Sequence, residues 1–273
     1  CLFPSTDKLY YVSIRTFSTD KHKSLPVCSA ICRIPETILK GSENLISFQL
    51  KRFPRGSLKR RIIPFQLCRK VPLDWVYLAA VVVVKNEASY LSEWLEYANL
   101  VGVERVFVYD NNSTDTLRET LLPYEKEGFV LRVSWPYNPK LGMQQGALND
   151  ALWRFGQYSA WLLCADPDEF VVPANGTSII PYIQPWDRHY VAALGLIELK
   201  FGTSHHVSRP PGLVLDNYRL RLRTCDEAPQ VRPCPAFREA RPFKMLVNTQ
   251  YAHLLYVHFP RVGASYPDGF REP

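Results

Sequence analysis

The stretch VYLAAVVVVKNEASYLSEWLEYANLVGVERVFVYD, residues Val76 to Asp110, carries the pattern of a strand, a helix and a second strand. Its first nine residues, Val76 to Val84, are apolar and rich in valine, which is typical of a strand buried on both faces of a parallel sheet. Apolar residues then recur at helical spacing from Leu91 to Val101, and Gly102 is placed to end that helix. Glu104 to Asp110 returns to strand composition, so the stretch predicts a parallel βαβ unit.

The same alternation continues along the chain. The pattern predicts a helix near Thr114 to Leu122, a strand from Phe129 to Val133, a helix from Met143 to Phe155 and a short strand from Ala160 to Ala165. This order predicts an α/β fold with a doubly wound sheet and right-handed crossovers. We expect a main domain over residues 73–262, an irregular N-terminal extension or subdomain over 1–72 and a tail over 263–273.

The positive charge is concentrated at the N-terminus. The chain has a formal net charge of +7, but residues 1–70 hold 14 Lys or Arg against 4 Asp or Glu, and the remainder is slightly acidic. The basic run KRFPRGSLKRR, Lys51 to Arg61, would suit an acidic lipid or polyanion, whereas a solvated basic strand or turn is the simpler interpretation. Without an accompanying aromatic or glycine pattern, we expect no nucleic-acid partner.

Membrane and cysteine signals are sparse. No apolar run reaches the roughly 18 residues of a membrane helix, and the start at Cys1 rather than Met leaves room for an anchor or signal segment upstream. Seven cysteines are present. Cys28 and Cys32 form a poor zinc pattern, Cys225 and Cys234 could pair in an oxidising compartment, and Cys164 is the thiol we expect to be buried and free.

Polar residues follow three of the predicted strands where each strand ends. They are Lys85 to Glu87, Asp110 to Asn112 and Asp166 to Glu169. Ligands of doubly wound sheets bind outside the carboxyl ends of the strands, so we expect all three sets to open on one edge.

Asp166 and Asp168 are separated by one residue after the strand AWLLCA. Such a pair can present oxygen atoms to one hard cation, and Mg²⁺ or Mn²⁺ accepts these ligands while leaving positions for phosphate oxygens. A metal on a diphosphate stabilises the charge that grows as the diphosphate leaves. An acidic solvated turn is the alternative, but the two other polar strand ends favour a site. No G-x-G-x-x-G or Walker lysine motif is present, which argues against dinucleotide and P-loop functions.

Five segments together resemble glycosyltransferase family 92, within the family 2-like GT-A enzymes. The segments are VVVVKNEASYLSEWLEYANLVGVERVFVYDNNSTD, QQGALNDAL, WLLCADPDEF, FGTSHH, and FKMLVN with a later VH. They span about Val76 to Pro260, some two thirds of the chain. The resemblance implies a GT-A-like, mostly parallel mixed sheet flanked by helices.

The resemblance assigns roles to the residues at the strand ends. It implies that Glu87 and Asp110, with Asn112 beside them, face the nucleotide, and that Asp166 and Asp168 hold Mn²⁺ and the diphosphate of the nucleotide sugar. His258, in YVHFP, matches a further metal ligand; a core or surface histidine is equally compatible with the sequence.

Several other residues acquire roles from the same resemblance. Lys244, in RPFKMLVN, would neutralise phosphate, and Arg238 and Arg241 could share that role or be solvated. Gln145 and Asn149 lie four apart on one helical face and would line the donor site, unless they serve packing or capping. FGTSHH, residues 201–206, resembles the acceptor-side loop, although His205 stands where the family more often has Gly.

Inverting transfer requires a carboxylate base for the acceptor hydroxyl. The candidates are Glu169, Glu198, Asp216 and Glu239. We select Glu169, which follows the aspartate pair, and Glu198, which precedes the FGTS segment. The alternatives are that Glu169 caps the turn and that Glu198 forms a salt bridge with Lys200 or an arginine.

The sequence therefore predicts a metal-dependent glycosyltransferase that moves a hexose from a nucleotide sugar onto a glycan acceptor. The resemblance implies UDP-galactose as donor, inversion at the sugar carbon, and a Golgi location with a lumenal catalytic domain and a membrane anchor outside this chain. Competing hypotheses are a non-catalytic glycan- or nucleotide-sugar-binding relative, and a polyanion binder that uses the basic extension. Glycosylation sequons start at Asn111, Asn112 and Asn175. In a lumenal protein Asn175 is the better acceptor, because the first two lie in the expected nucleotide loop; chance occurrence of the sequons is the alternative.

Overall fold

The computed structural model describes most of the chain after residue 72 and four strands before it. The described residues are 13–17, 27–31, 45–52, 61–68, 73–136, 143–187, 190–221, 244–256 and 260–262. The chain divides into two compact units, Cys1–Leu73 and Asp74–Pro273.

The described residues of the first unit form two antiparallel strand pairs. β1 (Ser13–Phe17) pairs with β2 (Val27–Ile31), and β3 (Leu45–Arg52) pairs with β4 (Arg61–Cys68). The basic run identified in the sequence contributes the end of β3 and the start of β4, with Arg52 opposite Arg61. Residues 53–60 of that run lie outside the described residues.

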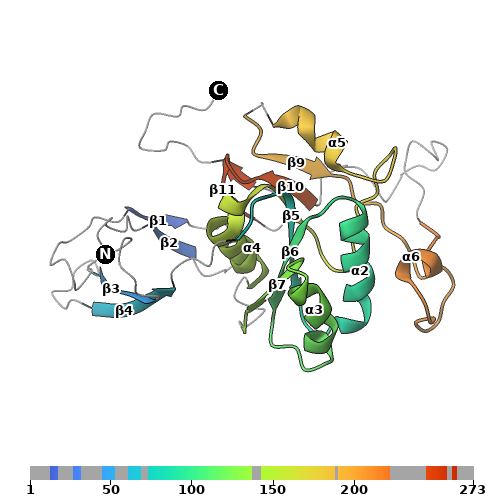
Figure 1. Ribbon diagram of the computed structural model, residues 1–273, viewed down its shortest axis with the longest axis horizontal. Coiled ribbons are helices and arrows are strands. Elements are labelled where there is room, and N and C mark those ends of the chain that lie inside the picture. Colours follow the sequence, from blue (N-terminus) through green and yellow to red (C-terminus); the bar gives the residue numbers. More distant parts are fainter. Residues whose placement is uncertain are drawn as a thin grey trace, which may run out of the picture. The chain divides into compact units, whose positions relative to one another are not determined.

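The second unit is built on a six-stranded mixed sheet (Figure 1). Its strands, in their order across the sheet, are β7 Val130–Ser134, β6 Arg105–Asp110, β5 Val76–Val84, β8 Ser159–Cys164, β10 Lys244–Asn248 and β9 Ala193–Leu196. The first four strands in that order are parallel, and β10 runs antiparallel to both of its neighbours. This confirms the predicted doubly wound, mostly parallel sheet. A separate antiparallel pair is formed by β11 Ala252–Leu255 and β12 Pro260–Val262.

Helices cover both faces of this sheet. In Figure 1, α4 (Met143–Phe155) lies on the opposite side of the sheet from α2 (Ala88–Leu100) and α3 (Leu117–Lys126). The shorter helical elements are η2 Gly156–Tyr158, α5 Ile180–Ile183, η3 Gln184–Trp186 and α6 Val214–Asn217. In the described part of the chain, no helix combines the length and apolar character needed to cross a membrane.

The pleat of β5 explains why this strand is apolar throughout. Leu78, Ala80, Val82 and Val84 pack in the core that α2 contributes with Leu91, Trp94 and Leu95. Alternate side chains of the sheet face α4, where the Phe107 and Phe155 rings stack with centroids 4.4 Å apart. Because both faces are covered, neither set of positions can be polar.

One edge of the sheet gathers the polar strand ends. The parallel strands β5, β6, β7 and β8 all finish there, with Val84 of β5 paired to Asp110 of β6. Since β9 is antiparallel to β10 and β10 is antiparallel to β8, β9 also finishes at this edge and β10 starts there, at Lys244. The predicted convergence of the three polar segments on one edge is therefore confirmed.

Candidate functional site

The centre of the site is a closed turn after β8. The backbone N–H of Asp166 donates to Glu169 Oε2 at 2.8 Å, and the backbone N–H of Glu169 donates to the Asp166 carbonyl at 3.1 Å. The indole N–H of Trp94, on α2, donates to the Glu169 carbonyl at 2.8 Å. These bonds hold the acidic turn against the helix that follows β5.

Lys244 brings a positive charge to the same turn. Its Nζ lies 2.5 Å from Asp166 Oδ2 and 3.0 Å from Glu169 Oε2, and its side chain is 12% exposed. Although burial opposes the charge, hydrogen bonding and attraction from Asp166 and then Glu169 raise the pKa of Lys244 above its ordinary value. Burial raises the pKa of Glu169, only partly offset by its bond from the Asp166 backbone and by Lys244. We conclude that Lys244 is charged here.

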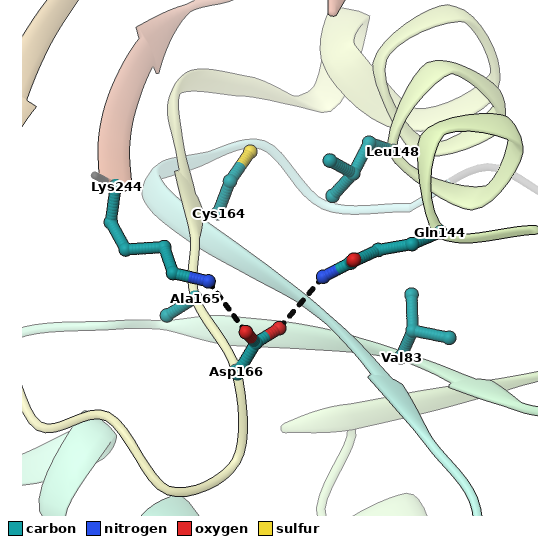
Figure 2. A pocket seen from close by; sticks show the side chains of 7 residues that line it. All are labelled: Val83, Gln144, Leu148, Cys164, Ala165, Asp166 and Lys244. Atoms are coloured by element: carbon teal, nitrogen blue, oxygen red, sulfur yellow. Dashed lines mark hydrogen bonds and ion pairs between the residues drawn. The ribbon is translucent and has the colours of Figure 1, made fainter. Parts of the chain in front are cut away.

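Gln144, on α4, completes the surroundings of Asp166. Its Nε2 donates to Asp166 Oδ1 at 2.8 Å, so both carboxylate oxygens of Asp166 are engaged, one from β10 and one from α4 (Figure 2). The small pocket around these groups is also lined by Val83, Leu148, Cys164 and Ala165. The sequence prediction missed Gln144 because it selected the helical face of Gln145 and Asn149 instead.

Asp168 is the exposed carboxylate of the turn. In the described part of the chain it makes no hydrogen bond or ion pair, but its charge acts on Glu87 at the end of β5. Burial, and then the negative charges of Asp168 and Asp115, raise the pKa of Glu87. The polar ends of β5 and β8 thus approach closely enough for their carboxylates to repel.

The loops after β5 and β6 are bonded to each other. Asn86, with φ of 59°, receives the Thr114 N–H on its Oδ1 at 2.8 Å and donates its own N–H to Ser113 Oγ at 3.0 Å. Asp115 Oδ2 accepts the first N–H of α2, from Ala88, at 3.0 Å. These hydrogen bonds join the two loops to each other beside Glu87.

Asp110 and Asn112 lie at the end of β6 and in the loop that follows it. Asp110 accepts the Ser113 N–H at 2.9 Å and lies 3.5 Å from the Arg132 guanidinium, and its side chain is 14% exposed. Asn112 is exposed, with φ of 57°. Asp110 therefore shapes its own loop, and contact of either residue with a nucleotide stays a prediction.

Asn149 lies deeper than the sequence pattern suggested. It is buried, its Nδ2 donates to the carbonyls of Gln145 and Leu255 at 2.7 Å each, and its Oδ1 accepts the Leu255 N–H at 2.8 Å. The packing alternative therefore accounts for its contacts, since it attaches α4 to β11. Gln145 is half-buried, and its place in a donor site stays a prediction.

The two leading base candidates differ in their surroundings. Glu198 lies two residues after β9, half-buried at the same sheet edge, and makes no hydrogen bond or ion pair with any described residue. Glu169, in contrast, accepts the Asp166 N–H and pairs with Lys244. Asp216 is exposed and lies 3.2 Å from the Arg219 guanidinium.

In the segment FGTSHH, which the resemblance predicts to be the acceptor-side loop, one of the two histidines is held by neighbouring groups. His206 Nε2 lies 3.2 Å from the Asn217 carbonyl and its ring packs edge-on against Tyr218, whereas His205 is exposed with φ of 69°. Four further candidates lie outside the described residues: Arg238, Glu239, Arg241 and His258.

Within residues 73–136, 143–187, 190–221 and 244–256, no group of three or more His, Cys, Asp or Glu side chains is arranged to hold a metal ion. Cys164 is buried and free, as predicted, while Cys225 and Cys234 lie outside the described residues. Of the sequon asparagines, Asn111 is buried and donates to the Trp135 carbonyl at 2.7 Å, whereas Asn175 is exposed.

Comparison with known sequences decides the family. The sequence model described as Glycosyltransferase family 92 matches residues 78–264. The chain belongs to glycosyltransferase family 92. A family 92 protein of Oryza sativa subsp. japonica is 31% identical over 146 residues, which are 51% of this chain and 24% of that protein. A family 92 protein of Ricinus communis is 35% identical over 94 residues, 34% of this chain and 16% of that protein. The match with the rice protein thus spans about a quarter of its length.

Solved structures show partial likeness to this family 92 chain. Staphylococcus aureus TarS 1-349 in complex with UDP has a TM-score of 0.41 and 18% identity, with 64% of this chain and 48% of that chain covered. Glucosyl-3-phosphoglycerate synthase from Mycobacterium tuberculosis, in complex with Mn²⁺, UDP and glucosyl-3-phosphoglycerate, has a TM-score of 0.30 and 17% identity, with 43% and 42% covered.

Proposed function

We propose that the chain is a glycosyltransferase that moves a hexose from a nucleotide sugar to a hydroxyl of a glycan acceptor, with Mn²⁺ or Mg²⁺ as its cation. The observation that carries this proposal is the meeting of Glu87, Asp110 and Asp166–Asp168 at the carboxyl edge of the parallel sheet. Ligands of doubly wound sheets bind at this edge. Membership in family 92 supports sugar transfer as the reaction.

Different parts of the edge suit different parts of the donor. The loops after β5 and β6 offer a binding surface for a nucleoside, because hydrogen bonds of Asn86 join them. Lys244 offers a flexible cation for the diphosphate. The acidic turn with Asp166 and Asp168 lies beside Lys244, where the diphosphate would bind.

The donor atoms of the turn fit a divalent cation in part. Asp168 is an exposed oxygen ligand that repels Glu87, and oxygen ligands of this kind suit Mn²⁺ and Mg²⁺. Asp166 can also bind the cation once Lys244 and Gln144 no longer occupy its carboxylate oxygens. A bound cation would offset the negative charge that develops on the leaving diphosphate.

Glu198 is the better candidate for the base. Glu169 already accepts the Asp166 N–H and pairs with Lys244, so its carboxylate holds the turn. Glu198 makes no such bonds with described residues and follows β9 at the same edge. Its carboxylate can take the proton of an acceptor hydroxyl as the sugar carbon is attacked from the side opposite the diphosphate.

UDP-galactose, with inversion, is the donor to test first, and the Golgi lumen is the location that the family resemblance favours. A screen of six nucleotide sugars, read out as release of the nucleotide diphosphate with and without glycan acceptors, tests the function. We expect acceptor-dependent release from UDP-galactose that is lost in Asp168→Asn and kept in the control Glu119→Gln on α3.

A second candidate function follows from the engagement of both Asp166 oxygens. A non-catalytic relative that binds nucleotide sugar would give binding without diphosphate release for every donor and acceptor, whereas an active transferase gives release for at least one pair. This outcome would replace the catalytic proposal.

A further inference from the structure

The ammonium group of Lys244 already pairs with the carboxylates of the acidic turn. Lys244 Nζ contacts one oxygen of Asp166 at 2.5 Å and one of Glu169 at 3.0 Å, so a single ammonium serves two carboxylates. Gln144 takes the remaining oxygen of Asp166 at 2.8 Å. Figure 2 shows Asp166 between the Lys244 and Gln144 side chains, which reach it from β10 and α4.

A divalent cation on Asp166 would compete with the Lys244 ammonium. A cation bound to Asp166 Oδ2 would occupy the place of Lys244 Nζ, and one bound to Oδ1 would replace Gln144 and put a second positive charge on a carboxylate that Lys244 already pairs. Either arrangement weakens the contact between Lys244 and Asp166 and favours release of Lys244.

We propose that Lys244 is an exchangeable counter-ion: it neutralises Asp166 in the ligand-free chain and passes to the nucleotide diphosphate when a divalent cation binds Asp166. This inference rests on the proposed function and adds the coupling between its two ligands. The ammonium loses one anion and gains another, so the exchange leaves no charge unpaired.

The structure confines this movement to a side chain. The backbone of Lys244 is fixed in β10, paired with Leu196 of β9, while its side chain is unbranched and carries three donors. Glu169 Oε2, at 3.0 Å from Nζ, gives the ammonium a second anchor about which it can turn. Neither strand of the sheet has to shift.

Exchange predicts a reciprocal coupling between cation and diphosphate. The cation releases Lys244 for the diphosphate, and the diphosphate holds Lys244 away from Asp166, so each ligand tightens the other. Without Lys244, the cation meets no competitor and the diphosphate loses a partner.

The test is direct Mn²⁺ binding to the 273-residue chain, measured by titration calorimetry or electron paramagnetic resonance without nucleotide. Lys244→Met should bind Mn²⁺ about tenfold more tightly than the wild type, and at saturating Mn²⁺ it should bind UDP about tenfold more weakly. Lys126→Met, an exposed lysine on α3, should change neither affinity. Unchanged or weaker Mn²⁺ binding by folded Lys244→Met would overturn the exchange.

A measurement on the wild type covers the case in which Lys244→Met does not fold. Acetylation of Lys244, followed by peptide mass spectrometry, should be slow in the free chain, faster with Mn²⁺ alone and slow again with Mn²⁺ and UDP. An acetylation rate of Lys244 that neither Mn²⁺ nor UDP changes would contradict the exchange.

The outcomes separate this inference from the proposed function. If the wild type binds Mn²⁺ and UDP but Lys244→Met has no effect, only the exchange fails. If UDP binds equally well with and without Mn²⁺, Lys244 reaches the diphosphate without being released from Asp166 by the cation, and the exchange also fails. If the wild type binds neither ligand, both proposals fail.

Discussion

The carboxylate of Glu169 accepts the backbone N–H of Asp166 at 2.8 Å, and the backbone N–H of Glu169 donates to the Asp166 carbonyl at 3.1 Å. This reciprocal pair closes the turn that carries the acidic site. Glu169 was a candidate base in the sequence, with turn closure as the alternative. Its bonds favour the alternative.

Glu169→Gln should therefore behave differently from Glu169→Ala. Glutamine keeps an acceptor for the Asp166 N–H, so we expect transfer to fall by only about fivefold. Alanine leaves that N–H without a partner, at a cost of about 1–3 kcal/mol in stability. Urea unfolding and initial transfer rates measure both effects. If Glu169→Gln abolishes transfer with stability intact, Glu169 is the base.

Asn149→Ala should destabilise the protein because it strips partners from buried backbone groups. The Asn149 amide satisfies both the N–H and the carbonyl of Leu255. Their loss should lower the free energy of unfolding by about 2–3 kcal/mol, measured by urea titration. Gln145→Ala, on a half-buried side chain one turn earlier, should change it by about 0.5 kcal/mol or less. Equal stability of the two variants would show that the Asn149 bonds to β11 are dispensable.

Substitutions at Gly102 and Gly128 separate the stability cost of a positive φ from the cost of steric crowding by neighbouring side chains. Both have positive φ, 105° and 77°, but an added Cβ would lie 2.9 Å from Ser178 Oγ at Gly102 and would meet nothing within 4 Å at Gly128. Gly128→Ala should cost about 1 kcal/mol through the backbone alone. Gly102→Ala should cost more, since the added Cβ would also lie 3.0 Å from Ile180 and the Ser178 and Ile180 side chains must shift. Thermal unfolding of both variants checks the difference, and equal losses would argue against crowding.

Cys164 should resist alkylation in the folded protein. Burial raises the pKa of its thiol to about 12, only partly offset by the charge of Lys244, so almost no thiolate exists at pH 8. Iodoacetamide at pH 8 should modify the Cys164 peptide slowly in buffer and rapidly in urea, as measured by mass spectrometry. Rapid modification in buffer would mean that the strand end at β8 opens readily.

The sheet was largely predictable because its strands are buried on both faces. The continuous apolar run from Val76 to Val84 coincides with β5, and Gly102 follows α2 as expected. The helix expected from Thr114 begins instead at Leu117, because Ser113, Thr114 and Asp115 bond to the loop after β5. It also continues past Pro123 to Lys126. These bonds join residues 27 or 28 positions apart, which a local pattern does not contain.

The site was predictable at the level of backbone but less so at the level of side chains. Topology alone placed Glu87, Asp110 and Asp166 on one edge. The contact of Lys244 with Asp166 depends on β10 pairing antiparallel with β8, between residues 78 positions apart. Gln144 was missed because helical spacing alone does not say whether Gln144 or Gln145 reaches the strand end.

The most direct test of the central claim is calorimetric titration of UDP into the 273-residue chain at saturating Mn²⁺, comparing wild type with Asp166→Ala plus Asp168→Ala. Glu119→Ala, on the exposed side of α3, serves as the control. We predict binding by the wild type and the control, and a loss of at least about tenfold in the double variant, since the diphosphate loses its cation. Absence of binding by the folded wild type, or unchanged binding by the double variant, would contradict the account.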